Sequence, residues 1–169
     1  LKLTDNKLSN IPNGIDLRKV TQTKTEFLGK LGINNNRRII FSVVALLEKR
    51  KGHIFLLEAI KLISKKTASK EMPLFIFEGN GAEKENVFTF IEQNDLGSFV
   101  VHLESIDNIF NLYNASDVLI LPSIENEDFP NVIIEAMGMS KPVIGTKIAG
   151  IPEQIDDGIN GYVVEPANP

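Results

Sequence analysis

The sequence contains no cysteine, which excludes both disulfide bonds and metal sites built on thiolates. Its two histidines, His53 and His102, are isolated from each other and cannot form a zinc site by themselves. No Asp-x-Asp motif is present that could hold a divalent cation beside a diphosphate. The sequence therefore predicts a protein that works without a bound metal or other cofactor.

Long apolar runs and an excess of basic residues are also missing. The longest apolar runs, such as residues 118–121, are much shorter than the roughly 20 residues that a membrane-spanning helix requires, and the N-terminus lacks the layout of a signal peptide. The formal net charge is −4, and the basic residues are scattered apart from Lys49-Arg50-Lys51. We therefore expect a cytoplasmic protein that binds no nucleic acid.

Apolar strands alternate with amphipathic helices along the chain. Residues 38–45 form a continuous apolar run rich in β-branched residues, which is typical of a strand buried on both faces. Further strands are expected at residues 74–77, 99–103, 118–121, 142–145 and 161–164, and helices at 23–31, 83–93, 109–114 and 130–139. This alternation predicts an α/β fold with a doubly wound, Rossmann-like parallel sheet.

Two shorter segments carry more specific expectations. A helix is expected after Gly52, with Leu56, Ala59, Ile60 and Ile63 on one face because they recur at i, i+3, i+4 and i+7. The pair Asn13-Gly14 predicts a tight turn or loop near the N-terminus.

Ligands bind open parallel sheets beyond the C-terminal ends of the strands, so the loops at those ends hold the candidate site. Lys51 lies in the first such loop, directly before a helix whose free N–H groups and dipole favour an anion, and it is placed to neutralise a phosphate. The alternative is that Lys49-Arg50-Lys51 is an ordinary solvated turn. Gly79-Asn80-Gly81 lacks the third glycine of a dinucleotide fingerprint and indicates a structural turn.

The loop after residues 118–121 combines carboxylates with a helix start. Pro130 and Asn131 suit the first helical positions, which places Glu127 in the loop and Glu135 in the second turn of the helix. Carboxylates accept hydrogen bonds from hydroxyls and helix amides donate to oxyanions, as a sugar joined to a nucleotide diphosphate requires. The alternative is that these acidic residues only complement the helix dipole.

Several short motifs occur in a fixed order along nearly the whole chain. They are Lys51-Gly52, Pro122-Ser123, Glu127 followed after seven residues by Glu135-Ala136-Met137, Lys141-Pro142-Val143-Ile144, Gly150-Ile151-Pro152-Glu153 and Asp156-Asp157-Gly158. This order resembles the signature of retaining GT-B glycosyltransferases of family 4, the glycosyl transferases group 1. The resemblance implies that residues 1–169 are the C-terminal donor-binding domain of such an enzyme.

The resemblance also implies a ligand and a set of site residues. The ligand is a nucleotide-diphosphate sugar, whose sugar is transferred with retention of configuration. Lys51 would bind the diphosphate and help it to leave, Glu127 would lie at the donor sugar, and Glu135 would bind the ribose. The intervening backbone amides that reach sugar or phosphate oxygens would belong to Asp128, Phe129, Pro130, Asn131 and Val132. The resemblance assigns the catalytic roles to Lys51 and Glu127, with no metal ion.

The same resemblance leads us to expect that an N-terminal acceptor-binding domain and a last C-terminal helix lie outside this chain. That acceptor domain could bring the protein to the inner face of the membrane. The chain departs from the family pattern at Leu46, where an arginine is usual and Arg50 or Lys49 could substitute, and at Asp128 and Ser140, where glycine is usual. A non-catalytic nucleotide-sugar-binding module and a GT-B-related epimerase therefore remain as alternatives.

Overall fold

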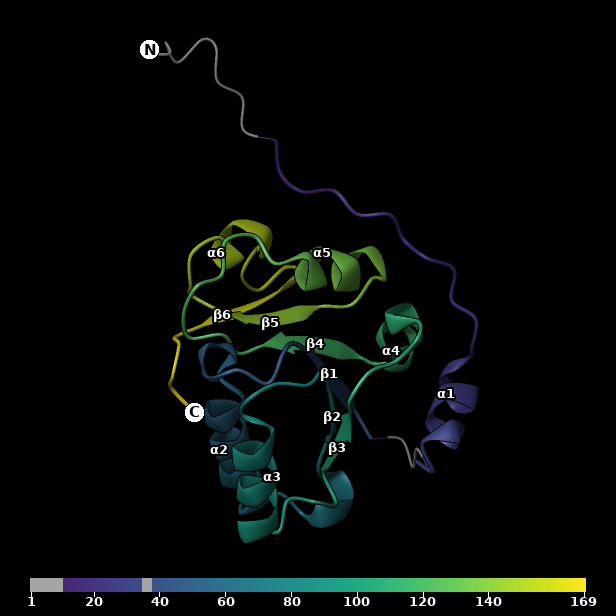
Figure 1. Cartoon of the computed structure of the whole chain (residues 1–169), viewed down its shortest axis with the longest axis vertical. Helices are drawn as coiled ribbons and strands as arrows, with labels where there is room; N and C mark the ends of the chain where they lie inside the picture. The colour runs from purple at the N-terminus through teal and green to yellow at the C-terminus, as the bar shows by residue number, and fades with distance from the viewer. Residues whose placement is uncertain (1–10, 35–37) are drawn as a thin grey trace.

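The computed structural model describes residues 11–34 and 38–169. It contains a sheet of parallel strands in the order β3-β2-β1-β4-β5-β6 (Figure 1). The strands are β1 (Ile40–Val44), β2 (Leu74–Glu78), β3 (Val100–Leu103), β4 (Val118–Leu121), β5 (Val143–Thr146) and β6 (Gly161–Val164). The order reverses between β1 and β4, as in a doubly wound Rossmann-like sheet, so the predicted fold class is confirmed.

Helices cover both faces of this sheet. They are α1 (Lys24–Lys30), α2 (His53–Ser64), α3 (Lys84–Gln93), α4 (Ile109–Ala115), α5 (Asn131–Gly138) and α6 (Ile151–Gln154), with short 3-10 helices η2 (Lys49–Lys51) and η3 (Ser69–Glu71). Figure 1 shows α2 and α3 on one side of the sheet and α4, α5 and α6 on the other. Helix α6 was not expected from the sequence, although Pro152 and Glu153 in its first turn are typical of a helix start. None of the helices in the described ranges is long and apolar enough to cross a membrane.

The two faces of the strands build separate parts of the core. In β2, Phe75 and Phe77 pack on the α2 side with residues such as Leu57, whereas Leu74 and Ile76 pack on the α1 and α4 side. All four of these strand residues are buried. Burial on both faces explains why the strands read as continuous apolar runs rather than as alternating patterns.

The fully buried residues of α2 are mostly not those of the expected apolar face. The fully buried residues are His53, Leu57 and Ile60, whereas Ile63 is exposed. Of the expected stripe, only Ile60 lies in the core, and the other members border an apolar groove of about 320 Å³ beside β4 and β5. The four residues share one face of α2, as expected, and line the same groove. Because α2 is apolar around most of its circumference, its periodicity fits two overlapping faces and cannot identify the one that meets the sheet.

Residues 11–22 form an extended segment without regular secondary structure. Neither Asn13 nor Gly14 has a positive φ, so the segment is a loop rather than the tight turn that the pair also allowed. Asn13 donates a side-chain hydrogen bond to Asn131 at the start of α5, and the backbone N–H of Thr21 donates to the side chain of Asn111 on α4. This segment therefore follows the same side of the sheet as α4 and α5.

The residue that follows the C-cap of α5 is Ser140, with a φ of 58°. This left-handed conformation carries little cost for glycine but is unfavourable for residues with a Cβ. The position is one of the two at which the resemblance leads us to expect glycine. Ser140 thus adopts a backbone conformation that favours glycine.

Candidate active site

Two loops meet at the C-terminal edge of the sheet, where the strand order reverses. They are residues 45–52, which follow β1, and residues 122–130, which follow β4. The backbone N–H of Ile124 donates to the carbonyl of Arg50 at 2.7 Å. Gly52 has a φ of 69°, and a Cβ there would lie 2.0 Å from the carbonyl oxygen of Pro122, so only glycine fits. This close approach holds Lys51 against the second loop.

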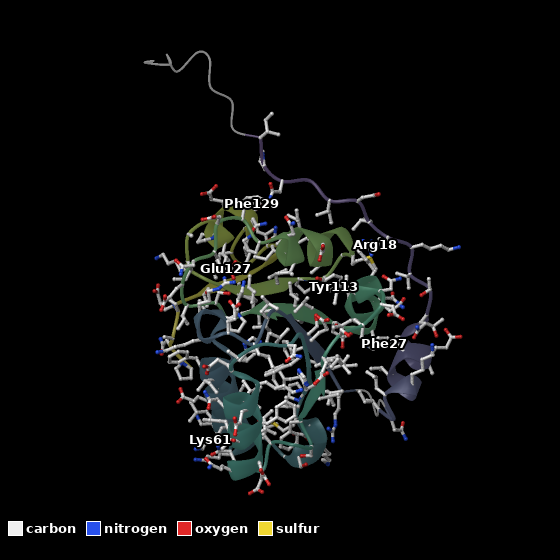
Figure 2. The ribbon with its side chains drawn as sticks, in the orientation of Figure 1. Arg18, Phe27, Lys61, Tyr113, Glu127 and Phe129 are labelled. Carbon is white, nitrogen blue, oxygen red and sulfur yellow. The ribbon has the colours of Figure 1, made fainter. Side chains whose placement is uncertain are left out.

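Glu127 is the centre of a polar network between these loops. Its side chain is buried, and its Oε1 accepts hydrogen bonds from the Lys51 ammonium and, at 2.7 Å, from the Ser123 hydroxyl. The Thr146 hydroxyl at the end of β5 donates to the Ser123 carbonyl and holds that residue in turn. Among the described residues, none donates a hydrogen bond to Oε2 of Glu127, so this oxygen keeps its capacity to accept one. Figure 2 shows Glu127 in the loop at the edge of the sheet, with Phe129 nearer α6.

Arg50 joins the same network from the side. Its Nε donates to Glu48 at 2.7 Å and its Nη1 to the Asn126 carbonyl at 3.2 Å, while Nη1 lies 4.0 Å from Oε1 of Glu127. Lys49 instead borders a separate cavity of about 190 Å³. Of the two residues considered as substitutes for the usual arginine, the structure thus brings only Arg50 to Glu127.

The start of α5 faces the same edge. Pro130 is the N-cap and has no N–H, so it cannot donate a backbone hydrogen bond to the donor, and its expected place among the donor-binding residues stays a prediction. The N–H groups of Asn131 and Val132 are in the first turn and have no intrahelical partner, so they can donate to an anion. Asp128 is exposed and Phe129 is partly buried.

The short helix α6 supports the loop that precedes α5. Gly150 approaches so closely that a Cβ would lie 1.7 Å from the carbonyl oxygen of Asp128, and its N–H donates to the Glu127 carbonyl at 3.3 Å. The Gln154 side chain donates to the Pro130 carbonyl at 3.2 Å. These hydrogen bonds to the carbonyls of Glu127 and Pro130 therefore hold the loop backbone on both sides of Asp128 and Phe129.

Glu135 lies in the second turn of α5, as expected, and has a different partner. Its Oε2 accepts a hydrogen bond of 2.8 Å from the hydroxyl of Tyr113 on α4, and no other described residue donates to its Oε1. Glu135 is four positions after Asn131 in the helix, which corresponds to about 6 Å along the axis. Burial and the neighbouring Glu135 carboxylate raise the pKa of Tyr113, so the phenol stays protonated and can donate.

The site contains residues that the sequence analysis did not assign. Ser123 was noted only as part of a motif, although its position four residues before Glu127 is a weak signal. Nothing in the local pattern pointed to Tyr113, because its partner comes from another helix. Among the described residues, no group of three potential ligands for a metal ion was found, and binding without a metal stays a prediction.

The comparisons with known proteins agree on one family. The sequence model of "Glycosyl transferases group 1" matches residues 23–169. The chain is 30% identical over 164 residues to the UDP-Gal:alpha-D-GlcNAc-diphosphoundecaprenol alpha-1,3-galactosyltransferase of Escherichia coli, covering 94% of this chain and 41% of the relative. It is 28% identical to the N-acetyl-alpha-D-glucosaminyl L-malate synthase of Bacillus anthracis, covering 88% of this chain and 36% of the relative. The chain thus spans less than half the length of these relatives.

Solved structures of glycosyltransferases share the fold. A glycosyltransferase of Rickettsia africae is 28% identical with a TM-score of 0.76, and the match covers 86% of this chain and 38% of that one. HepE of Anabaena, solved with UDP and glucose, is 24% identical with a TM-score of 0.75 and covers 86% and 39%, which shows the fold alone. With the family model matching most of the chain, this protein belongs to the glycosyl transferases group 1 family and has the Rossmann-like α/β fold of GT-B glycosyltransferases.

Proposed function

We propose that this chain is the donor-binding half of a retaining glycosyltransferase of family 4. It would bind a nucleotide-diphosphate sugar, and the sugar would be transferred to an acceptor held by an N-terminal domain outside this chain. The observation that carries the proposal is the convergence of Lys51, Glu127 and the first turn of α5 at the C-terminal edge of the sheet. Cations, helix amides and a carboxylate oxygen that accepts no hydrogen bond from the described residues together match the groups of such a donor.

In this proposal the diphosphate binds Lys51 and the N–H groups of Asn131 and Val132, within reach of the loop backbone at Asp128 and Phe129. The phosphate oxygens would compete with Glu127 for the Lys51 ammonium, which is paired with Glu127 in the structure. Arg50 lies close enough to Glu127 to add a second positive charge to the same site. Positive charge is needed most when the sugar–phosphate bond breaks, because negative charge then grows on the leaving diphosphate.

The two glutamates would hold different parts of the donor. Each has one carboxylate oxygen occupied by a protein partner and one that accepts no hydrogen bond from the described residues. Glu127 precedes α5 and would accept from a hydroxyl of the transferred sugar. Glu135 lies further along the helix and would accept from the ribose. Front-side attack by the acceptor on an oxocarbenium-like sugar would then give retention.

The choice of UDP as the first nucleotide to test follows from the relatives. The Escherichia coli relative is named for UDP-Gal, and HepE was solved with UDP. A solved C-terminal domain of the glycosyl transferase LpcC of Francisella tularensis, of which this chain covers 82%, supports a domain of this size as a unit. We expect the complete protein to build polysaccharide or glycolipid in the cytoplasm, where its acceptor domain could contact the inner face of the membrane.

Calorimetry of this chain with UDP and UDP-linked sugars, with and without EDTA, tests the proposal. We expect binding that EDTA does not abolish. Glu135→Ala should weaken UDP and UDP-sugar alike by about tenfold, whereas Glu127→Ala should weaken only the UDP-sugar, because a hydrogen bond to a charged group contributes about 1.5 to 3 kcal/mol.

The exposed Glu125 of the same loop provides a matched control, and Glu125→Ala should bind both ligands like the parent. The proposal is wrong if both glutamate variants bind UDP and UDP-sugar as tightly as the parent while remaining folded. Sugar transfer by this chain alone would also contradict it, since catalysis by positioning requires a bound acceptor.

A further inference from the structure

Tyr113 is a fully buried tyrosine whose hydroxyl contacts one of the proposed ligand-binding glutamates. We propose that Tyr113 is a positioning residue that holds the Glu135 carboxylate in the orientation that accepts a ribose hydroxyl. This inference rests on the proposed function, because it deepens the role assigned to Glu135.

The hydrogen bond limits the freedom of a flexible side chain. A glutamate on a helix surface has several rotamers, and selecting one of them on ligand binding costs conformational entropy. In this structure Oε2 of Glu135 is 2.8 Å from the Tyr113 hydroxyl, while Oε1 has no donor among the described residues. The carboxylate is therefore oriented before a ligand arrives, with one oxygen left available.

The side chain of Tyr113 is itself held in place by the residues packed around it. It is 0% exposed and belongs to the core cluster that includes Leu119 and Ile133, and its ring meets Phe110 edge to face with centroids 5.8 Å apart. The ring therefore has little room to change rotamer. Burial and the adjacent carboxylate raise the pKa of Tyr113, so the hydroxyl remains a donor. Figure 2 shows Tyr113 on the part of α4 that lies next to α5.

A purely structural role predicts a different pattern. If the hydrogen bond only joins α4 to α5, its loss would lower stability but would have no particular relation to the ribose. If it orients Glu135, its loss should weaken only ligands that carry the ribose hydroxyl, and only while Glu135 is present. These two expectations can be separated by binding measurements.

The test uses Tyr113→Phe, which removes the hydroxyl and keeps the ring, together with Glu135→Ala and the double variant. Binding of UDP, 2′-deoxy-UDP, 3′-deoxy-UDP and pyrophosphate is measured by calorimetry. We expect Tyr113→Phe to weaken UDP about three- to tenfold. Pyrophosphate should bind like the parent, and at least one deoxy analogue should lose the effect. In the Glu135→Ala background, Tyr113→Phe should cause no further loss.

The exposed tyrosine of β6 provides the control, and Tyr162→Phe should bind all four ligands like the parent. The inference is overturned if Tyr113→Phe leaves UDP binding unchanged, weakens pyrophosphate equally, or still weakens UDP in the Glu135→Ala background. The proposed function fails differently: Glu135→Ala itself would then leave UDP binding unchanged. Melting temperatures show whether each variant is folded.

Discussion

Replacing Lys51 by methionine tests whether the network around Glu127 stabilises the site. Methionine has an apolar side chain of similar length, so the substitution removes the ammonium that pairs with the Glu127 carboxylate and changes the packing little. The side chain of Glu127 is 7% exposed and that of Lys51 12%, so the pair is largely withdrawn from water. After the substitution, the nearly buried carboxylate keeps the Ser123 hydroxyl as its single hydrogen-bond donor within residues 11–34 and 38–169.

The expected cost follows from what remains near the carboxylate. Removing one partner of a buried ion pair destabilises a protein by about 3 to 5 kcal/mol. Arg50 is only 4.0 Å from Glu127 and its side chain is 32% exposed, so it can shift and compensate in part. We therefore expect a loss of about 2 to 3 kcal/mol, at or just below the low end of that range. For a protein of this length, this corresponds to a melting temperature lower by about 5 to 10 °C.

Circular dichroism with thermal and urea denaturation at pH 7 measures the change. The double variant Lys51→Met/Glu127→Gln removes both charges and should recover most of the lost stability. The exposed pair Lys147–Glu165, with side chains 65% exposed, provides the control, and Lys147→Met should change stability by about 1 kcal/mol or less. The reasoning is refuted if Lys51→Met is as stable as the parent, or if the double variant is less stable than the single one.

Two further predictions concern stability away from the ligand. Burial, with the nearby charges of Lys51 and His102, lowers the pKa of His53 to about 4 from its ordinary value of 6.5, so the folded state favours the neutral ring. At a pH between these two pKa values, His53 takes up a proton when the protein unfolds. The free energy of unfolding should therefore fall as the pH decreases from about 6.5 to 4, by up to about 1.4 kcal/mol per pH unit. Urea denaturation at several pH values should show a smaller slope for His53→Leu. Ser140→Gly should raise stability by about 1 kcal/mol, because glycine adopts the positive φ without the Cβ penalty. Melting temperatures check this, and Ser98→Gly, at an exposed serine without a positive φ, should not give the increase.

The sequence by itself determined the fold class and the loops in which the candidate site lies. Continuous apolar runs such as residues 38–45 indicated strands that are buried on both faces. Because these runs alternate with segments of helical periodicity, the sequence predicted a parallel sheet. The position of a loop after a strand then placed Lys51 and Glu127 at the ligand edge, since all strands of a parallel sheet end on the same side. These properties depend on neighbours in the chain, which is why a pattern can report them.

The tertiary structure alone decided which side chains meet. Lys51 and Glu127 are 76 positions apart, and Glu135 is 22 positions from Tyr113, so neither pair leaves a periodic signal. The buried face of α2 was decided in the same way, because its sequence is apolar on more than one side and the sheet selects the face that packs. Contacts of this kind depend on strand order and on how each helix crosses the sheet, which local periodicity does not encode.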